Sequence, residues 1–172
     1  MIRTVAATGA LAIAMFGVSP ALADAHMEAH GEHGDHGAAH EKQTIMPEGE
    51  GARAFMEQFG FSEAVIHGDT VYLSGVILGG PREGETQEEA FDRGFRYIGS
   101  VLARAGSSWD DVIDITTYHV DIDASMPALA AVKSRYVNAP FPAWTAIDID
   151  RLYSPEGLVE IKVTARVTPA QD

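Results

Sequence analysis

The sequence predicts an α+β fold, a mixed α/β sandwich in which one sheet carries two helices packed on one face. Two amphipathic helical patterns are separated by a strand pattern, and a pair of strands both precedes and follows them. The predicted order is therefore strand-strand-helix-strand-helix-strand-strand. It occupies residues 61–168, which suits one domain in a chain of 172 residues.

The first two strands are predicted to form a hairpin. Residues 64–67 and 70–74 are rich in β-branched and other apolar residues, and they flank Gly68-Asp69, a two-residue turn signal. At Ser74-Gly75 the glycine either marks a bulge at the strand end or allows a ligand to approach the backbone closely. The glycine-rich stretch from Ile77 to Glu85 is predicted to be a loop.

Helix signals follow on both sides of a central strand. Thr86 and Glu89 have the spacing of a capping box, and the helix that they begin is predicted to stop at Gly106. Residues 112–122 are apolar on both faces, as in a strand covered on both sides. The second helix is predicted to begin in residues 121–127 and to end near Asn138.

The last two strands include the residue that matters most for function. From Ala143 apolar and polar residues alternate, and from Leu158 to Val167 the alternation is cleaner. Glu160 lies on the polar face of this β-branched strand, where glutamate is poorly suited. Two interpretations are open: a solvent-facing carboxylate, or a carboxylate held at the mouth of a pocket as a proton acceptor.

The N-terminal segment, residues 1–23, is predicted to be a signal peptide. Arg3 precedes an apolar run from Val5 to Val18, and Ala21-Leu22-Ala23 fits the small-residue cleavage rule. The alternative is a retained amphipathic anchor. We expect a periplasmic or secreted protein that begins near Asp24 and has no membrane partner after cleavage.

Residues 24–43 are predicted to be a disordered tail, because alanine, glycine and charged residues offer little apolar surface to bury. Imidazole binds zinc, nickel and copper, so the tail is a candidate metal-binding segment, with a solvated spacer as the alternative. The candidate ligands are His26, His30, His33, His36 and His40.

The remaining segments complete the predicted domain organisation, and the composition excludes some partners and chemistries. Residues 44–60 are predicted to hold an N-terminal strand and an insertion near the pocket rim, with a short helix closed by Gly60, and residues 169–172 form a C-terminal tail. A net charge of −13 argues against a nucleic-acid partner. The chain has no cysteine, which excludes thiol catalysis and disulfides.

Several short motifs, in order, resemble the RidA (YjgF) family of enamine and imine deaminases. They are Phe61–Val65, Tyr72–Gly75, Asp110–Val112, Pro142–Thr145 and Val159–Lys162. The family's last strand has the motif Val/Ile-Glu-Ile-Glu, which matches Val159-Glu160-Ile161-Lys162 here. The resemblance implies a chorismate-mutase-like fold and a homotrimer with small-molecule pockets between subunits.

The resemblance also implies a chemistry, the hydrolysis of imines or enamines such as 2-aminoacrylate, with no required cofactor. It makes Glu160 the catalytic residue. It places substrate binding on Phe61, Ser74, Gly75, Trp144 and Ala146.

Two of these positions depart from the family. Phe61 stands where tyrosine is common, and Trp144 stands where the carboxylate-binding arginine is expected. Without the guanidinium, activity on 2-aminoacrylate should be weak, and the indole suits a larger, less acidic or aromatic ligand. Two hypotheses therefore remain: an exported deaminase-like hydrolase that uses Glu160, or a non-catalytic trimer that binds a small ligand and has a metal-binding histidine tail.

Overall fold

The computed structural model describes residues 42–167, all of which belong to one compact unit, Ala38–Asp172. The predicted signal peptide, the C-terminal tail and the candidate metal ligands lie outside the described residues. Those ligands are His26, His30, His33, His36 and His40.

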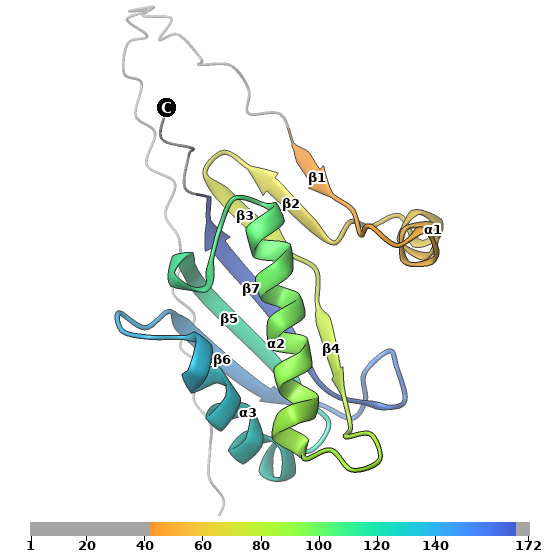
Figure 1. The fold of residues 1–172 in the computed structure, drawn as a ribbon, viewed down its shortest axis with the longest axis vertical. Helices are drawn as coiled ribbons and strands as arrows, with labels where there is room; N and C mark the ends of the chain where they lie inside the picture. Colours follow the sequence, from red (N-terminus) through yellow and green to blue (C-terminus); the bar gives the residue numbers. More distant parts are fainter. Residues whose placement is uncertain (1–41, 168–172) are drawn as a thin grey trace, which may run out of the picture. The chain divides into compact units, whose positions relative to one another are not determined.

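Seven strands form one sheet within the described residues, in the order β1-β2-β3-β7-β5-β6, and β4 also pairs with β7 (Figure 1). Only β5 and β6 are parallel, and helix α3 connects them. The strands are β1 (Gln43–Ile45), β2 (Ala64–His67), β3 (Thr70–Leu73), β4 (Val76–Gly79), β5 (Val112–His119), β6 (Ala143–Asp148) and β7 (Gly157–Arg166).

The helices α2 (Gln87–Arg104) and α3 (Ile122–Tyr136) cover one face of this sheet (Figure 1). The capping box at the start of α2 is confirmed, because Thr86 and Glu89 exchange side-chain and backbone hydrogen bonds. Asp121 caps α3 by accepting a bond of 3.0 Å from the backbone N–H of Ala124. Short helix α1 (Glu50–Phe59) has no buried residue and ends at Gly60 in the left-handed conformation.

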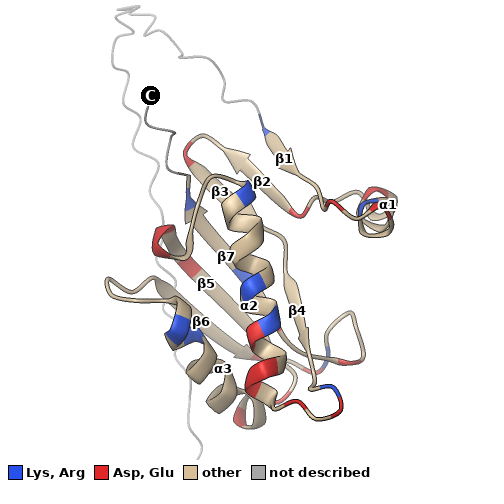
Figure 2. Cartoon of the chain, in the orientation of Figure 1, with Lys and Arg blue, Asp and Glu red and all other residues tan. Residues whose placement is uncertain are grey.

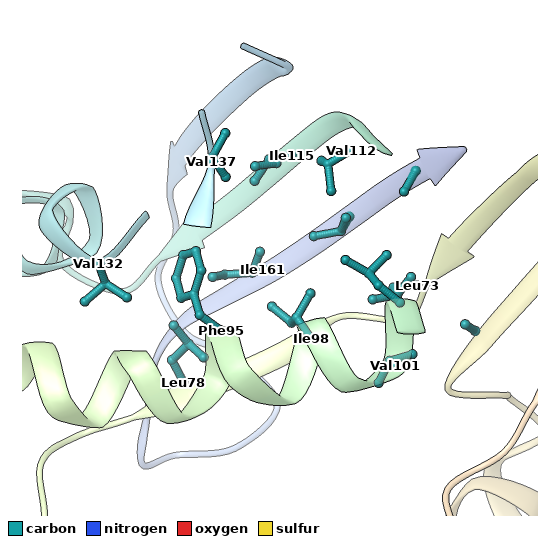
Figure 3. Close-up of a cluster of buried hydrophobic side chains, with 14 of the residues drawn as sticks. Leu73, Leu78, Phe95, Ile98, Val101, Val112, Ile115, Val132, Val137 and Ile161 are labelled. Atoms are coloured by element: carbon teal, nitrogen blue, oxygen red, sulfur yellow. The ribbon is translucent and has the colours of Figure 1, made fainter. Parts of the chain in front are cut away.

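The core fills the space between α2, α3 and the sheet (Figure 3). Phe95 and Ile98 point from α2 toward Ile161 on β7, and all three side chains are almost fully buried. The Phe95 ring also stacks on Trp109, with ring centres 5.2 Å apart. The apolar residues of β7 therefore face the helices, and Glu160 and Lys162, which alternate with them, lie on the face that no helix covers.

Two boundaries differ from the sequence interpretation. The segment from Val76 to Gly79 is a strand rather than the start of a loop, because its backbone pairs with β7. Periodicity does not reveal such a short strand when it ends in glycine. The strand β5 stops at His119, before the predicted end, because Asp121 already caps the next helix.

The same edge of β7 pairs with both β3 and β4, and the chain breaks away from it between them. The strand β3 pairs with residues 164–166 of β7, and β4 pairs with residues 157–161. The residues at this break are Ser74 and Gly75. The interruption leaves residues 162 and 163 of β7 without a partner on this edge, next to Glu160, which pairs with Ile77 of β4, so the break positions the candidate site.

Within residues 42–167, no helix combines the length and the apolar character that crossing a bilayer requires.

Candidate functional site

An open cavity of about 830 Å³ lies along β4, and residues of α1, α2 and β7 complete its wall. Four of the predicted site residues line it: Phe61, Ser74, Gly75 and Glu160. They come from segments almost a hundred residues apart in the chain, which the pairing of β4 with β7 brings together.

Gly75 leaves room for the Glu160 carboxylate. A Cβ atom at residue 75 would lie 1.9 Å from Glu160 Oε1, closer than any real contact. Of the two interpretations of this glycine, the structure therefore supports a close approach, made here by a carboxylate. Among residues 42–167, the half-buried Glu160 side chain has no hydrogen-bond or ion-pair partner.

Ser74 holds the break between the strands in place. Its hydroxyl donates a hydrogen bond of 2.6 Å to the Ser62 carbonyl, and its backbone N–H donates one of 2.9 Å to the Glu63 carbonyl. These bonds tie the break to the start of β2. Ser74 therefore positions the backbone beside Glu160, and its hydroxyl proton is already engaged.

An aromatic cluster lines the outer part of the cavity. Phe55 and Phe59 of α1 lie with ring centres 4.8 Å apart, Phe55 contacts Phe61 at 6.1 Å, and Phe59 contacts Tyr153 at 6.5 Å. All four rings are more than one-third exposed. The segment predicted as an insertion thus supplies apolar walls, which suit an apolar part of a ligand.

A polar cluster that the sequence did not reveal adjoins the same cavity, and two of its residues, Glu63 and Tyr97, line it. Glu63 is only 4% exposed, and it accepts hydrogen bonds from the Tyr97 hydroxyl and from the Arg104 guanidinium, with which it forms an ion pair. Burial and the hydrogen bond to Glu63 raise the pKa of Tyr97 to about 12. The one available signal was the spacing of Tyr97 and Arg104, two helical turns apart and so on one face of α2.

A second cavity, of about 610 Å³, opens on the uncovered sheet face and shares five lining residues with the first: Leu73, Ser74, Gly75, Tyr153 and Glu160. Its other polar side chains are Tyr72, Tyr118, Arg151 and Lys162. Glu160 therefore lies between an aromatic cavity on one side and a cavity with two cations on the other. Neither cation was predicted as a site residue from the sequence.

Trp144 and Ala146 lie apart from both cavities, on edge strand β6. The Trp144 indole N–H donates a hydrogen bond of 3.1 Å to Thr117 Oγ1, and Lys133 Nζ lies 4.3 Å from the ring centre. The indole therefore lies on the helix-covered side, and its donor is used within the chain. A substrate-binding role for Trp144 and Ala146 would need a neighbouring subunit, and it stays a prediction.

His119 has a structural environment. The side chain is fully buried, and its Nδ1 and Nε2 atoms lie 2.7 Å from Ser125 Oγ and 3.0 Å from Thr117 Oγ1. Burial lowers the pKa of His119, which favours the neutral ring. A neutral ring with both nitrogens engaged supports the strand and the start of α3. In the part of the chain that the structure describes, no three acidic or histidine side chains converge on a metal position.

Comparison with known proteins gives the wider context. Residues 52–167 match the family model described as Endoribonuclease L-PSP. The chain is 32% identical over 132 residues to the RutC family protein YjgH of Escherichia coli K12, a match that covers 74% of this chain and 96% of that protein.

Solved structures of YjgF family members are also similar to the chain. A YjgF family member from Neisseria meningitidis is 27% identical, with a TM-score of 0.60 over 77% of this chain and 100% of that chain. A YjgF/YER057c/UK114 family member from Mycobacterium tuberculosis is 24% identical and shares the fold, with a TM-score of 0.62 over 74% of this chain and 100% of that chain. The predicted fold class is confirmed, and the chain belongs to the RidA (YjgF) family.

Proposed function

We propose that this protein hydrolyses a small imine or enamine and that Glu160 assists the attacking water. The observation that carries the proposal is the position of the Glu160 carboxylate, which lies against Gly75 at the break between β3 and β4. It is open to both cavities and has no partner among the described residues. A carboxylate in this position is available to accept a proton from water.

The proposed reaction needs no oxidant and no cofactor. An enamine first gains a proton at carbon and becomes an iminium. Water then attacks the iminium carbon and transfers one proton to Glu160, while the C=N electron pair moves to nitrogen. Glu160 returns the proton to the nitrogen of the carbinolamine. The C–N bond then breaks as the hydroxyl oxygen forms the C=O bond, the hydroxyl proton passes to Glu160 and on to the departing ammonia, and the carbonyl product leaves.

Glu160→Gln tests this proposal because it keeps the shape of the side chain and removes its ability to accept a proton. The imine is generated in the assay from an amino acid by an added oxidase, and ammonia and keto acid are measured together. The wild type should release the two products in equal amounts faster than buffer alone, and Glu160→Gln should lose this acceleration while its affinity for the keto acid is retained.

Each other result contradicts hydrolysis by Glu160. Equal acceleration by wild type and Glu160→Gln would move the chemistry to another residue. Ligand binding without acceleration in either protein would support the non-catalytic binding hypothesis. Cleavage of RNA, which the description of the family model suggests, is assayed on the same samples; a net charge of −13 opposes the binding of a polyanion.

We also propose that three copies assemble and that the protein is exported. The uncovered sheet face, which includes the exposed ring of Tyr72, supports assembly with other copies of the chain. The N-terminal sequence pattern supports export, and the histidines His26 to His40 support metal binding by the tail.

Light scattering should give the mass of three chains, and mass spectrometry of the exported protein should place Asp24 first. A monomer mass or an intact Met1 would contradict these proposals. Removal of residues 24–43 should abolish zinc or nickel binding in a titration, and unchanged affinity would place the metal elsewhere.

A further inference from the structure

The proposed hydrolysis requires a group that holds the substrate, and Trp144 cannot provide a positive charge for it. We infer that Lys162, assisted by Arg151, binds the carboxylate of the substrate, and that the substrate is an imino or enamine acid with a large apolar or aromatic group. This inference rests on the proposed function and names the substrate class for the same site.

Lys162 and Glu160 line the same cavity. The two residues lie two positions apart on β7, on the face that no helix covers, where their Cα atoms are separated by about 6.7 Å. In an α-imino acid the carboxylate carbon is bonded directly to the imine carbon. If each of these two carbons lies about 3 Å from a protein group, the two protein groups are on the order of 7 Å apart. Lys162 can therefore hold the carboxylate while Glu160 faces the imine carbon.

The two cations of this cavity are available for a ligand. Five arginines of the described residues form ion pairs with carboxylates: Arg93, Arg96, Arg104, Arg135 and Arg166. Figure 2 shows how acidic and basic residues lie close together along α2. By contrast, Lys162 and Arg151 have no ion-pair or hydrogen-bond partner among residues 42–167. An anion in this cavity would meet positive charge that no protein carboxylate already neutralises.

The sequence of β7 also supports Lys162 as the residue that binds the carboxylate. Lys162 stands at the second glutamate of the Val/Ile-Glu-Ile-Glu motif, so this chain has a cation where the motif has an anion. Trp144 stands where the motif of the preceding strand has a cation. Since Trp144 lies apart from both cavities, only the change at residue 162 puts a charge into the cavity that Glu160 lines.

The other side of Glu160 indicates what else the substrate contains. The cavity of about 830 Å³ is far larger than a three-carbon enamine needs. Its outer wall is the aromatic cluster of Phe55, Phe59, Phe61 and Tyr153. A ligand with its imine carbon at Glu160 and its carboxylate at Lys162 can therefore extend an apolar group toward these rings, as an imine of an aromatic amino acid would do.

The test measures binding separately from turnover. Isothermal titration calorimetry compares phenylpyruvate, its methyl ester and pyruvate. The wild type should bind phenylpyruvate about ten- to a hundredfold more tightly than the ester, because only the acid carries the anion. It should also bind phenylpyruvate more tightly than pyruvate, because only phenylpyruvate reaches the aromatic cluster.

Matched variants assign these preferences to residues. Lys162→Met, alone and with Arg151→Met, should remove the preference for the acid over the ester, and Lys162→Arg should retain it. Arg166→Met is the control, because Arg166 lies on the same face of β7 but outside both cavities, paired with Asp69. For the apolar side, Phe59→Ala should weaken the binding of phenylpyruvate but not the binding of pyruvate. Phe141→Ala, at an exposed ring away from the cavities, should change neither affinity.

The outcomes separate this inference from the proposed function. If the Lys162→Met/Arg151→Met double variant keeps the wild-type preference for acid over ester, the inference is wrong even when Glu160→Gln has lost turnover. If turnover is absent but the preference disappears in the double variant, the carboxylate site is supported and the hydrolysis proposal fails. A change in oligomer mass without a change in the preference would show that the cations serve subunit contacts, and would overturn the inference.

Discussion

Gly75→Ala is expected to lower turnover by about 10²–10⁴-fold, as complete removal of a general base would. The reason is steric. The new methyl carbon would lie 1.9 Å from Glu160 Oε1 and 2.7 Å from its carboxyl carbon, so the carboxylate has to leave its position. Because these atoms end a flexible side chain that has no other partner, the displacement should cost little stability.

The measurement is kcat for the imine together with the midpoint of urea unfolding. Gly80→Ala is the matched control, because its Cβ would meet only Leu158 Cδ1, at an ordinary 3.8 Å, and residue 80 lies outside both cavities. Gly75→Ala and Glu160→Gln should also be non-additive, because both remove the same carboxylate from the site. Full activity in Gly75→Ala would show that the observed position of Glu160 is not the reactive one.

Glu63→Ala is expected to have the largest effect on stability, a loss of about 3 kcal/mol in the free energy of unfolding. Glu63 is 4% exposed, and its carboxylate accepts hydrogen bonds from Arg104 and Tyr97. Removing it leaves a largely enclosed guanidinium without its counter-charge. Arg104 would keep only its bond of 3.0 Å to the Met46 carbonyl.

Urea denaturation measures this loss, and Asp69→Ala is the control. Asp69 also pairs with an arginine, Arg166, but their side chains are 61% and 64% exposed, so the loss there should be at most about 1 kcal/mol. Equal losses in the two variants would mean that the burial of Glu63 adds nothing to its ion pair.

The same cluster predicts a dependence of stability on alkaline pH. Burial, and then the hydrogen bond and charge of Glu63, raise the pKa of Tyr97 to about 12, against about 10 in the unfolded chain. The folded state thus favours the neutral phenol. The stabilisation is complete below about pH 10 and is lost as the pH rises toward about 12.

Comparing the loss of stability at alkaline pH in wild type and Tyr97→Phe isolates the contribution of Tyr97. Tyr136 also contributes, because burial and Asp92 raise its pKa. Ultraviolet titration should show one late-titrating tyrosine fewer in Tyr97→Phe. In Glu63→Gln the pKa of Tyr97 should fall, because the charge that opposes its ionisation is gone. An unchanged titration in both variants would contradict the contact between Tyr97 and Glu63.

Local patterns in the sequence were sufficient for most of the fold. The capping box at Thr86 and Glu89 specifies the start of α2 from four consecutive residues. The alternation from Leu158 to Val167 specifies which side chains of β7 are buried, and so places Glu160 opposite the core. Each of these features depends on residues that are neighbours in the chain. Hydrophobic periodicity and helix caps can therefore be predicted without the tertiary structure. The short strand β4 has no such pattern, since only its pairing with β7 makes it a strand.

The composition of the site was decided by the tertiary structure. Glu160 was predictable as a residue, but its contact with Gly75 exists because β3 and β4 separate along one edge of β7. The pair of Glu63 and Arg104 joins residues 41 positions apart. The face of β6 that carries Trp144 is likewise set by the register of β6 against β5, which brings the indole N–H to Thr117. These contacts depend on which strands become neighbours and on which charges find partners, and both arise from long-range packing that no local period in the sequence encodes.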